Sequence, residues 1–241
     1  WLAIHVANLF GIDKVSFAER VAWVDQHRAA LLDSAANPLD GHRFWATADK
    51  PWMALAACFE WAGYLADGDS FLSHLPIAID GSNSGLQHLT ALLRDPEATP
   101  HVNLVATERP GDMYAVVAAK MQAIVDASSD PDATPWRNDR ITRGIVKRPC
   151  MTYAYSATPQ GMADQIRAEL SRIDSAARED GRPSHLGGAD NFRAGGWLAR
   201  QLHRTISETV PAARRAMDWL KAATRIINAA DLPLWWTPAT G

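Results

Sequence analysis

The sequence has 241 residues, of which 47% are hydrophobic and 21% are charged. This composition is typical of a folded globular protein and is sufficient for one large domain or two smaller ones. A formal net charge of −3 argues against a uniformly basic nucleic-acid coat protein, although a local basic groove is compatible with it.

The cysteines and the chain ends indicate the class of protein. The two cysteines, Cys58 and Cys150, do not have metal-ligand spacing and can form at most one disulfide, which favours a reduced, intracellular protein. The sequence shows no signal-peptide pattern and no run of about 18 apolar residues, so we expect no membrane span. The chain begins at Trp1 without a methionine and stops at Gly241 within apparent turn chemistry. We therefore expect it to be a piece of a longer protein.

The first part of the chain predicts two helices. Apolar residues recur at near-helical spacing over residues 15–32, and Ser16 is in position to cap this helix. Residues 38–51 contain two prolines and a glycine and are expected to be a connection. A buried helix is predicted over residues 52–65, and the sequence DGDS at residues 67–70 should end it.

The middle of the chain predicts one strand followed by two helices. The short apolar run at residues 75–79 predicts a strand that delivers Asp80 to a surface cleft. Helical character returns over residues 84–93, and a second helix is expected over residues 112–127. Residues 128–135 have the composition of a solvated loop.

The last part of the chain is also expected to be mostly helical. Residues 141–155 are compatible with a helix that Pro149 bends, and residues 179–196 have the composition of a mobile surface loop. A helix is predicted over residues 211–228, because a proline begins it and an apolar stripe faces inward. The stripe consists of Ala213, Met217, Leu220 and Ile227. The predicted fold class is α+β, predominantly helical with short strands.

Two groups of residues could carry chemistry. Asp80 ends an apolar run and Gly81 follows it, so a carboxylate and an unobstructed carbonyl could face a hard cation such as Mg²⁺. Arg143, Lys147 and Tyr155 would fall within about a third of a helix circumference, where the two cations suit a triphosphate. Taken alone, the Asp-Gly pair is more often a turn and the two cations are more often a solvated helix face.

Longer strings around both groups resemble one family. DGSNSGLQHLTALLRD, residues 80–95, resembles the first catalytic motif of the single-subunit RNA polymerases of phages and mitochondria. RGIVKRPCMTYAY, residues 143–155, resembles the fingers helix of the same family. The resemblance implies that Asp80 holds both catalytic metal ions and that the carbonyl of Gly81 also ligates metal.

The resemblance also assigns the nucleotide contacts. It implies that Arg143 and Lys147 bind the incoming triphosphate and that Tyr155 contacts the sugar and helps to select ribose. Lys147 and Tyr155 count with Asp80 among the residues expected to be catalytic. The family usually has glycine after this tyrosine, whereas Ser156 follows it here.

Three further positions follow from the same resemblance. DNA-polymerising relatives place a glutamate five residues after the motif aspartate, whereas Gly85 leaves room there for a ribose 2′-hydroxyl. Lys14 corresponds to a lysine that approaches the nucleotide phosphates, and Tyr114 to a tyrosine that stacks near the template base pair. The alternatives are an ordinary surface charge for Lys14 and a core aromatic for Tyr114.

The family's right-hand architecture implies three regions. Residues 1–100 would form the palm portion, residues 101–230 the fingers portion, and residues 231–241 the start of the return toward the palm. The expected reaction is DNA-templated RNA synthesis with two Mg²⁺ ions. The sequence contains no His-Asp dipeptide, which holds the second catalytic aspartate in the family, so the chain alone is expected to be inactive.

The resemblance further implies the partners and the location. Promoter and template DNA, nascent RNA and nucleoside triphosphates are the expected partners of a monomeric polymerase that does not bind membranes. The cytoplasm of a bacterial host is the expected location, with an organelle as an alternative. A different interpretation is a decayed, non-catalytic relative that binds nucleic acid through the same scaffold.

Overall fold

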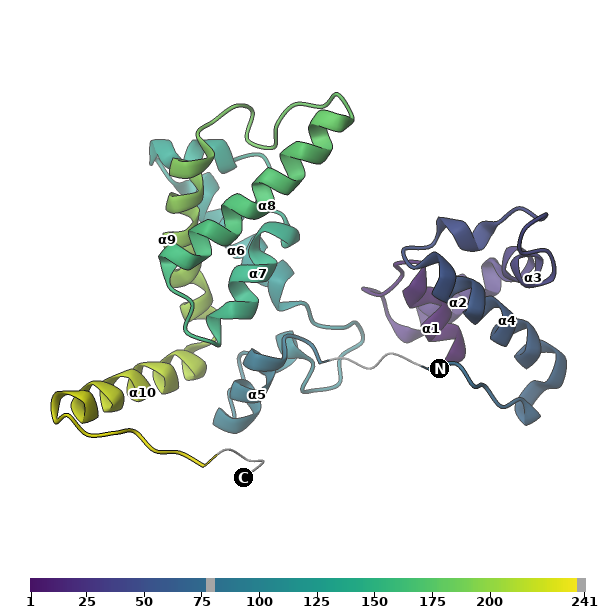
Figure 1. Ribbon diagram of the computed structural model, residues 1–241, viewed down its shortest axis with the longest axis horizontal. Helices are drawn as coiled ribbons and strands as arrows, with labels where there is room; N and C mark the ends of the chain where they lie inside the picture. The colour runs from purple at the N-terminus through teal and green to yellow at the C-terminus, as the bar shows by residue number, and fades with distance from the viewer. Residues whose placement is uncertain (77–80, 238–241) are drawn as a thin grey trace. The chain divides into compact units, whose positions relative to one another are not determined.

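The structure is a computed structural model that describes residues 1–76 and 81–237 and consists of two compact units (Figure 1). The first unit contains the chain up to residue 80 together with residues 107–110. The second contains residues 81–106 and the chain from residue 111 onward. This division into compact units does not test the assignment of palm and fingers portions, which stays a prediction.

The first unit is a small group of helices around its own apolar core. Val6, Val24, Leu31 and Cys58 are fully buried in this core. The helices are α1 (Leu2–Leu9), α2 (Phe17–Gln26), α3 (Arg28–Ala36) and α4 (Pro51–Asp67), with short 3₁₀ helices at Phe44–Thr47 and Gly68–Ser70.

The helix predicted over residues 15–32 is divided into two. Ser16 caps α2 as expected, because its Oγ accepts from the Glu19 backbone N–H at 3.2 Å and the Glu19 carboxylate accepts from the Ser16 N–H at 2.8 Å. The chain leaves the helical conformation at His27, where φ is −98° and ψ is 12°. The imidazole Nδ1 of His27 lies 2.8 Å from the Trp23 carbonyl oxygen and so partners a backbone group at the break.

Helix α4 is buried on one face rather than all round, so the prediction of a buried helix was too broad. Ala54, Ala57 and Trp61 face the core, whereas Trp52 and Phe59 are exposed. The reason is that only one side of α4 has helices of this unit packed against it, chiefly α1, α3 and the 3₁₀ helix Phe44–Thr47. The DGDS sequence ends the helix as predicted, since α4 stops at Asp67.

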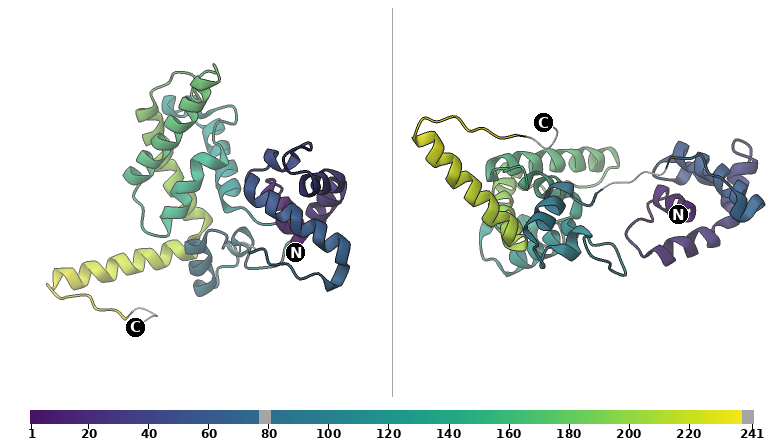
Figure 2. Two further views of the ribbon diagram at one scale, coloured as in Figure 1. Left: turned by 45° about the vertical axis from the view of Figure 1, so that its right-hand side comes forward. Right: turned by 90° about the horizontal axis from the view of Figure 1, so that it is seen from below.

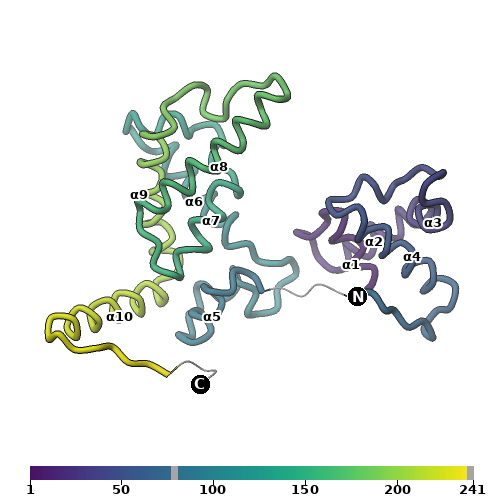
Figure 3. The backbone as a smooth tube through the Cα atoms, in the orientation of Figure 1, coloured from purple at the N-terminus to yellow at the C-terminus, as the bar shows by residue number. Residues whose placement is uncertain are grey.

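The second unit is larger and contains the second core. Its long helices α8 and α9 run side by side, and α6 and α7 pack against them (Figure 3). The helices are α5 (Ser84–Leu93), α6 (Met113–Ala127), α7 (Arg143–Tyr153), α8 (Pro159–Glu179), α9 (Asn191–Thr209) and α10 (Pro211–Ala229), with 3₁₀ helices at Thr99–Val102 and Pro131–Trp136.

The helices predicted over residues 84–93 and 112–127 are confirmed as α5 and α6. The loop predicted over residues 179–196 is partly wrong, because α8 continues to Glu179 and α9 already begins at Asn191. Asp190 accepts from the Phe192 backbone N–H at 2.8 Å and caps α9. Glycine and polar residues suggested a loop there, but tertiary packing and this cap override the local preference.

The inward stripe predicted on α10 is buried over only half of its length. Ala213 and Met217 are buried, whereas Leu220 is 53% exposed. The start of α10 packs against α5 and α9, and its second half extends past the other helices of its unit (Figure 2). The apolar periodicity therefore predicted the helix correctly but not how far its partners reach.

The predominantly helical fold class is confirmed. Residues 1–76 and 81–237 contain no β-strand, and the strand predicted at residues 75–79 lies mostly outside the described residues. Within the same described ranges, no helix combines the length and the apolar character needed to span a membrane.

Candidate nucleotide-binding site

Helix α7 presents the two predicted triphosphate-binding cations on its outer side. Thr142 caps the helix by accepting from the Ile145 backbone N–H at 3.4 Å, and Ile145 and Val146 are buried in the core. Burial of these side chains leaves Lys147 exposed and Arg143 partly exposed. The predicted helix was longer, because α7 ends at Tyr153 and Tyr155 follows it rather than sharing its face.

Arg143 is held in place by two groups from α6. Its Nε donates to Asp112 Oδ2 at 2.6 Å, and its guanidinium carbon lies 4.9 Å from the centre of the Tyr114 ring. No residue in the described part of the chain accepts from the Nη groups of Arg143. The donors that can grip phosphate oxygens in pairs therefore stay available on an oriented guanidinium.

Asp112 belongs to the candidate site, and the sequence did not predict this. Its Oδ1 caps α6 by accepting from the backbone N–H groups of Tyr114 and Ala115 at 3.1 and 3.3 Å, while its Oδ2 binds Arg143. The sequence placed Asp112 at the start of a helix, which is the signal for a cap. Nothing local reveals the second role, because Arg143 is 31 residues further along the chain.

Gly85 and Tyr155 lie against each other, although 70 residues separate them in the sequence. A Cβ atom on Gly85 would come within 2.8 Å of the Ala154 Cβ and 3.3 Å of the Tyr155 hydroxyl oxygen. The contact with Ala154 is too short for any side chain at position 85, so only glycine fits without a shift of α5 or α7. The Tyr155 side chain itself is 72% exposed.

Ser156 has a backbone conformation that favours glycine. Its φ is +63°, in the left-handed region that costs a residue with a side chain about 1 kcal/mol or more. The single-subunit polymerases that the sequence resembles usually have glycine at this position. The structure thus keeps the turn after Tyr155 and accepts the backbone strain of a serine.

Substituting Ser156 with glycine is expected to raise the free energy of unfolding by about 1 kcal/mol, because the left-handed conformation loses its steric cost. Urea unfolding followed by circular dichroism measures the change. Ser171→Gly, at an exposed position inside α8, is the matched control and should lower stability by about 0.5 kcal/mol. Equal effects of the two substitutions would contradict the assignment of strain to Ser156.

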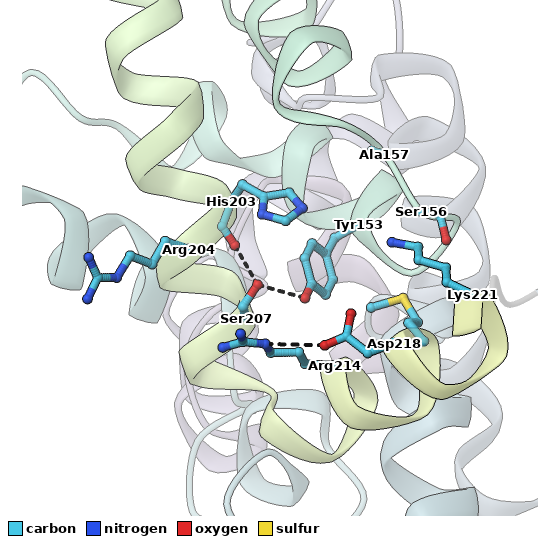
Figure 4. Close-up of a pocket in the computed structure, with 10 residues that line it drawn as sticks. Tyr153, Ser156, Ala157, His203, Arg204, Ser207, Arg214, Asp218 and Lys221 are labelled. Atoms are coloured by element: carbon cyan, nitrogen blue, oxygen red, sulfur yellow. Dashed lines mark hydrogen bonds and ion pairs between the residues drawn. The ribbon is translucent and has the colours of Figure 1, made fainter. Parts of the chain in front are cut away.

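Ser156 and Ala157, which follow Tyr155 in the chain, line a polar pocket (Figure 4). Tyr153 is buried and its hydroxyl lies 2.8 Å from the Ser207 Oγ. Because Ser207 donates its own proton to the His203 carbonyl oxygen at 2.8 Å, the Tyr153 hydroxyl is the donor to Ser207. This chain of hydrogen bonds fixes the end of α7 to α9.

The pocket has a volume of about 230 Å³ and a positive local field. Burial is the largest cause that lowers the pKa of His203, and the charges of Lys221 and Arg214 lower it further, so the imidazole is neutral at pH 7. In Figure 4 the Lys221 amine points into the pocket, toward the side of Tyr153 and His203. Neither Arg143 nor Lys147 lines this pocket, which is therefore separate from the two predicted triphosphate contacts.

Comparison with known proteins gives the family. The family model described as DNA-dependent RNA polymerase matches residues 1–233 of this chain. The chain belongs to the DNA-dependent RNA polymerase family. The predicted resemblance to the single-subunit enzymes is thereby confirmed, and a chance likeness of two short motifs is excluded.

Named relatives of this polymerase family come from organelles. The chain is 38% identical over 95% of its length to "DNA-directed RNA polymerase, mitochondrial" of Schizosaccharomyces pombe, of which it covers 19%. Over its whole length it is 34% identical to "DNA-directed RNA polymerase 1, mitochondrial" of Arabidopsis thaliana, of which it covers 25%. It is also 35% identical over its whole length to "DNA-directed RNA polymerase 2B, chloroplastic/mitochondrial" of Nicotiana tabacum, of which it covers 24%. The chain thus spans a fifth to a quarter of the length of these relatives.

Lys14, the remaining predicted phosphate contact, lies in the first unit. Its Nζ pairs with Asp13 Oδ2 at 2.7 Å. The turn around it is held by the buried Arg20, which donates to the Asp13 carbonyl oxygen at 2.7 Å and to the Val15 carbonyl oxygen at 3.0 Å. Arg143 and Lys147 belong to the second unit, and the contact between Lys14 and the same triphosphate stays a prediction.

The predicted metal site falls at the edge of the described residues. Asp80 lies outside the described residues, and Gly81 begins the segment that leads into α5. Within residues 1–76 and 81–237, no group of three or more histidine, cysteine, aspartate or glutamate side chains could hold a metal ion. The Mg²⁺ ions expected at Asp80 and Gly81 therefore stay a prediction.

Proposed function

We propose that this chain supplies the nucleotide-binding part of a DNA-directed RNA polymerase that joins ribonucleoside triphosphates along a DNA template. The observation that carries the proposal is the oriented guanidinium of Arg143, held by Asp112 and the Tyr114 ring with both Nη groups available. Lys147 lies one helical turn further along the exposed side of α7. Together they offer a planar fork and a point charge to a triphosphate.

The sugar-selecting role follows from the contact between Gly85 and Tyr155. Gly85 places no side chain against the Tyr155 hydroxyl, and Tyr155 is 72% exposed, so this hydroxyl is accessible to a polar group of the nucleotide. A ribose 2′-hydroxyl is such a group. This arrangement supports ribonucleotides rather than deoxyribonucleotides as substrates.

The proposed reaction is attack of the RNA 3′-hydroxyl on the α-phosphate of the bound nucleotide, with release of pyrophosphate. Arg143 and Lys147 hold the triphosphate and neutralise the charge that develops on the departing pyrophosphate. Mg²⁺ ions at Asp80 and Gly81 would supply further charge stabilisation. The second acidic anchor of the family is not found in this sequence, so we propose that the 241-residue chain alone does not catalyse synthesis.

The proposed partners are template and promoter DNA, the nascent RNA and nucleoside triphosphates, acting with a monomeric polymerase. The relatives named above are mitochondrial or chloroplastic, which favours an organelle as the location. The cytoplasm of a bacterial host has no such support and stays a prediction from the phage branch of the family.

Nucleotide binding provides the direct test. Arg143→Gln and Lys147→Gln are each expected to weaken ATP binding to the chain about tenfold, or about 1.4 kcal/mol, because each loses a charge-assisted contact with phosphate. Isothermal titration calorimetry measures the dissociation constants. Arg148→Gln is the matched control, since Arg148 is an exposed neighbour on the same helix without an ion-pair partner in the described chain.

The outcomes separate specific from general electrostatic binding. If Arg148→Gln weakens ATP binding as much as Lys147→Gln does, the assignment to one side of α7 is wrong. Catalysis is tested by primer extension with ribonucleotides and Mg²⁺, using the chain joined to the family's downstream catalytic segment, beside Asp80→Ala. RNA synthesis by the extended chain that is absent in Asp80→Ala would support the polymerase. If the extended chain is folded but makes no RNA, the alternative of a non-catalytic nucleic-acid-binding protein is favoured.

A further inference from the structure

A second hollow, distinct from the pocket in Figure 4, lies between α8 and α9. It has a volume of about 370 Å³, and its charged lining consists of Arg167, Arg193, Arg200 and Asp132. Three guanidinium groups face one carboxylate in this lining, and Arg167 also pairs with Asp164 at 2.7 Å, so one positive charge remains in excess, whereas the whole chain has a net charge of −3. The surface here thus has the opposite charge to that of the chain as a whole.

Two glycines in α9 let the arginines lie close to the helix. A Cβ atom on Gly195 would come within 3.2 Å of the Arg167 Cγ, and one on Gly196 would lie 3.7 Å from nitrogens of both Arg167 and Arg200. Glycine inside a helix costs about 1 kcal/mol relative to alanine. Glycine at position 195 allows the Arg167 side chain to pack directly against α9, which a larger residue would prevent.

Phe192 adds an aromatic surface to the same hollow. The guanidinium carbon of Arg167 lies 4.0 Å from the centre of the Phe192 ring, and the Arg167 Nη2 donates to the Phe192 carbonyl oxygen at 3.3 Å. The Phe192 side chain is nevertheless 65% exposed. One face of the ring is therefore covered by a fixed cation, and much of the rest is open to a flat partner.

The remaining cations are available to an anionic ligand to different degrees. Arg193 pairs with Asp132 at 2.9 Å, but its side chain is largely exposed, so this ion pair is screened by water. Arg200 has no ion-pair partner in the described chain. An anion entering the hollow would therefore meet one unpaired guanidinium and one that exchanges its partner at little cost.

We propose that this arginine–phenylalanine hollow binds a strand of nucleic acid, with phosphates on Arg193 and Arg200 and a base stacked on Phe192. An exposed aromatic ring between cations suits a strand that alternates flat bases with phosphates, whereas an acidic peptide would use the cations alone. Pro159 at the lip of the hollow follows Tyr155 by four residues, which keeps it within about 14 Å of that tyrosine. The inference rests on the proposed function, since a templated polymerase must hold a strand near its nucleotide.

Fluorescence anisotropy with a labelled single-stranded oligodeoxynucleotide tests the proposal on the 241-residue chain. Phe192→Ala is expected to weaken binding roughly tenfold through loss of stacking, and Phe192→Leu should not restore it, because leucine keeps apolar volume without a ring. Arg193→Gln and Arg200→Gln should each weaken binding and reduce the slope of log K against log salt by about 0.7. Arg178→Gln, an exposed charge elsewhere on α8, should leave the Phe192-dependent part of binding unchanged.

Three results would overturn the inference. These are no oligonucleotide binding, equal weakening by Arg178→Gln and the hollow variants, and binding of poly-glutamate as tight as that of the oligonucleotide. None of them bears on ATP binding at Arg143 and Lys147, so failure of this inference is distinguishable from failure of the proposed function. Circular dichroism of each variant confirms that its fold is intact before binding is compared.

Discussion

Replacing Trp136 with alanine is expected to lower the free energy of unfolding of the second unit by about 3–5 kcal/mol. Trp136 is fully buried in the core of that unit, and its indole Nε1 donates to the Ala194 carbonyl oxygen at 3.0 Å. The side chain thus joins the 3₁₀ helix Pro131–Trp136 to α9, 58 residues away in sequence. Its removal leaves a cavity and takes one hydrogen bond from the Ala194 carbonyl, which keeps only its helical partner in α9.

The two cysteines allow this loss to be measured in one unit at a time. Cys150 is buried in the same core as Trp136, and Cys58 is buried in the core of the first unit. Burial raises the pKa of the Cys58 thiol to about 11 and raises that of Cys150 well above its usual range, so neither is a reactive thiolate in the folded protein at pH 8. Pulse alkylation in increasing urea, read by mass spectrometry, therefore reports unfolding around each thiol.

Trp136→Ala should lower the urea midpoint of Cys150 labelling by about 1–3 M. Trp219→Ala is the matched control, because Trp219 belongs to the same unit but is 69% exposed, and it should change the midpoint little. Trp136→Phe keeps most of the apolar volume while removing the donor to Ala194, so it separates packing from hydrogen bonding. A Cys150 midpoint that is equal in Trp136→Ala and Trp219→Ala would show that this core does not depend on Trp136.

The sequence predicts the start of a helix where a capping residue marks it. Ser16 with Glu19, and Asp112 at the start of α6, act within three residues, and such caps can be read directly from the sequence. The start of α9 was missed because the loop-like composition before and after Asn191 concealed the cap. Secondary structure was thus predictable where the determining interaction is local.

The geometry of the candidate site needed the tertiary structure. The family resemblance indicated Arg143, Tyr114, Gly85 and Tyr155. It could not show that Arg143 contacts Tyr114 or that Gly85 contacts Tyr155. The sequence indicated Asp112 only as the start of a helix and not as the partner of Arg143. These contacts depend on how α5, α6 and α7 pack, and no periodicity within one helix encodes that packing.

The same limit applies to the hollow between α8 and α9. The composition of residues 179–196 predicts a mobile loop, in which the Phe192 ring and the Arg193 guanidinium would have no fixed relation. Because α9 begins at Asn191, Phe192 and the two glycines lie within about one helical turn and contact Arg167. The proposed nucleic-acid-binding role of this segment therefore depends on its being helical from Asn191 onward.

Introducing glutamate at Gly85 is expected to weaken ATP binding to the chain on the order of 100-fold, equivalent to about 2.7 kcal/mol. Even a single Cβ atom at this position would lie 2.8 Å from the Ala154 Cβ, so the larger side chain must push α5 away from the end of α7. It would also occupy the space beside the Tyr155 hydroxyl that we assign to the ribose 2′-hydroxyl. Binding of dATP, which lacks that group, should fall less than binding of ATP.

Parallel titrations of ATP and dATP into three variants separate packing from sugar selection. Gly85→Ala adds only the Cβ atom and measures the cost of the close contact between helices. Gly161→Glu makes the same exchange in the first turn of α8, where the nearest atom to a new Cβ is 3.6 Å away, and should leave both affinities near those of the parent. If Gly85→Glu lowers ATP and dATP binding by the same factor as Gly85→Ala does, then Gly85 serves the packing of α5 on α7 alone, and ribose selection must reside in another group.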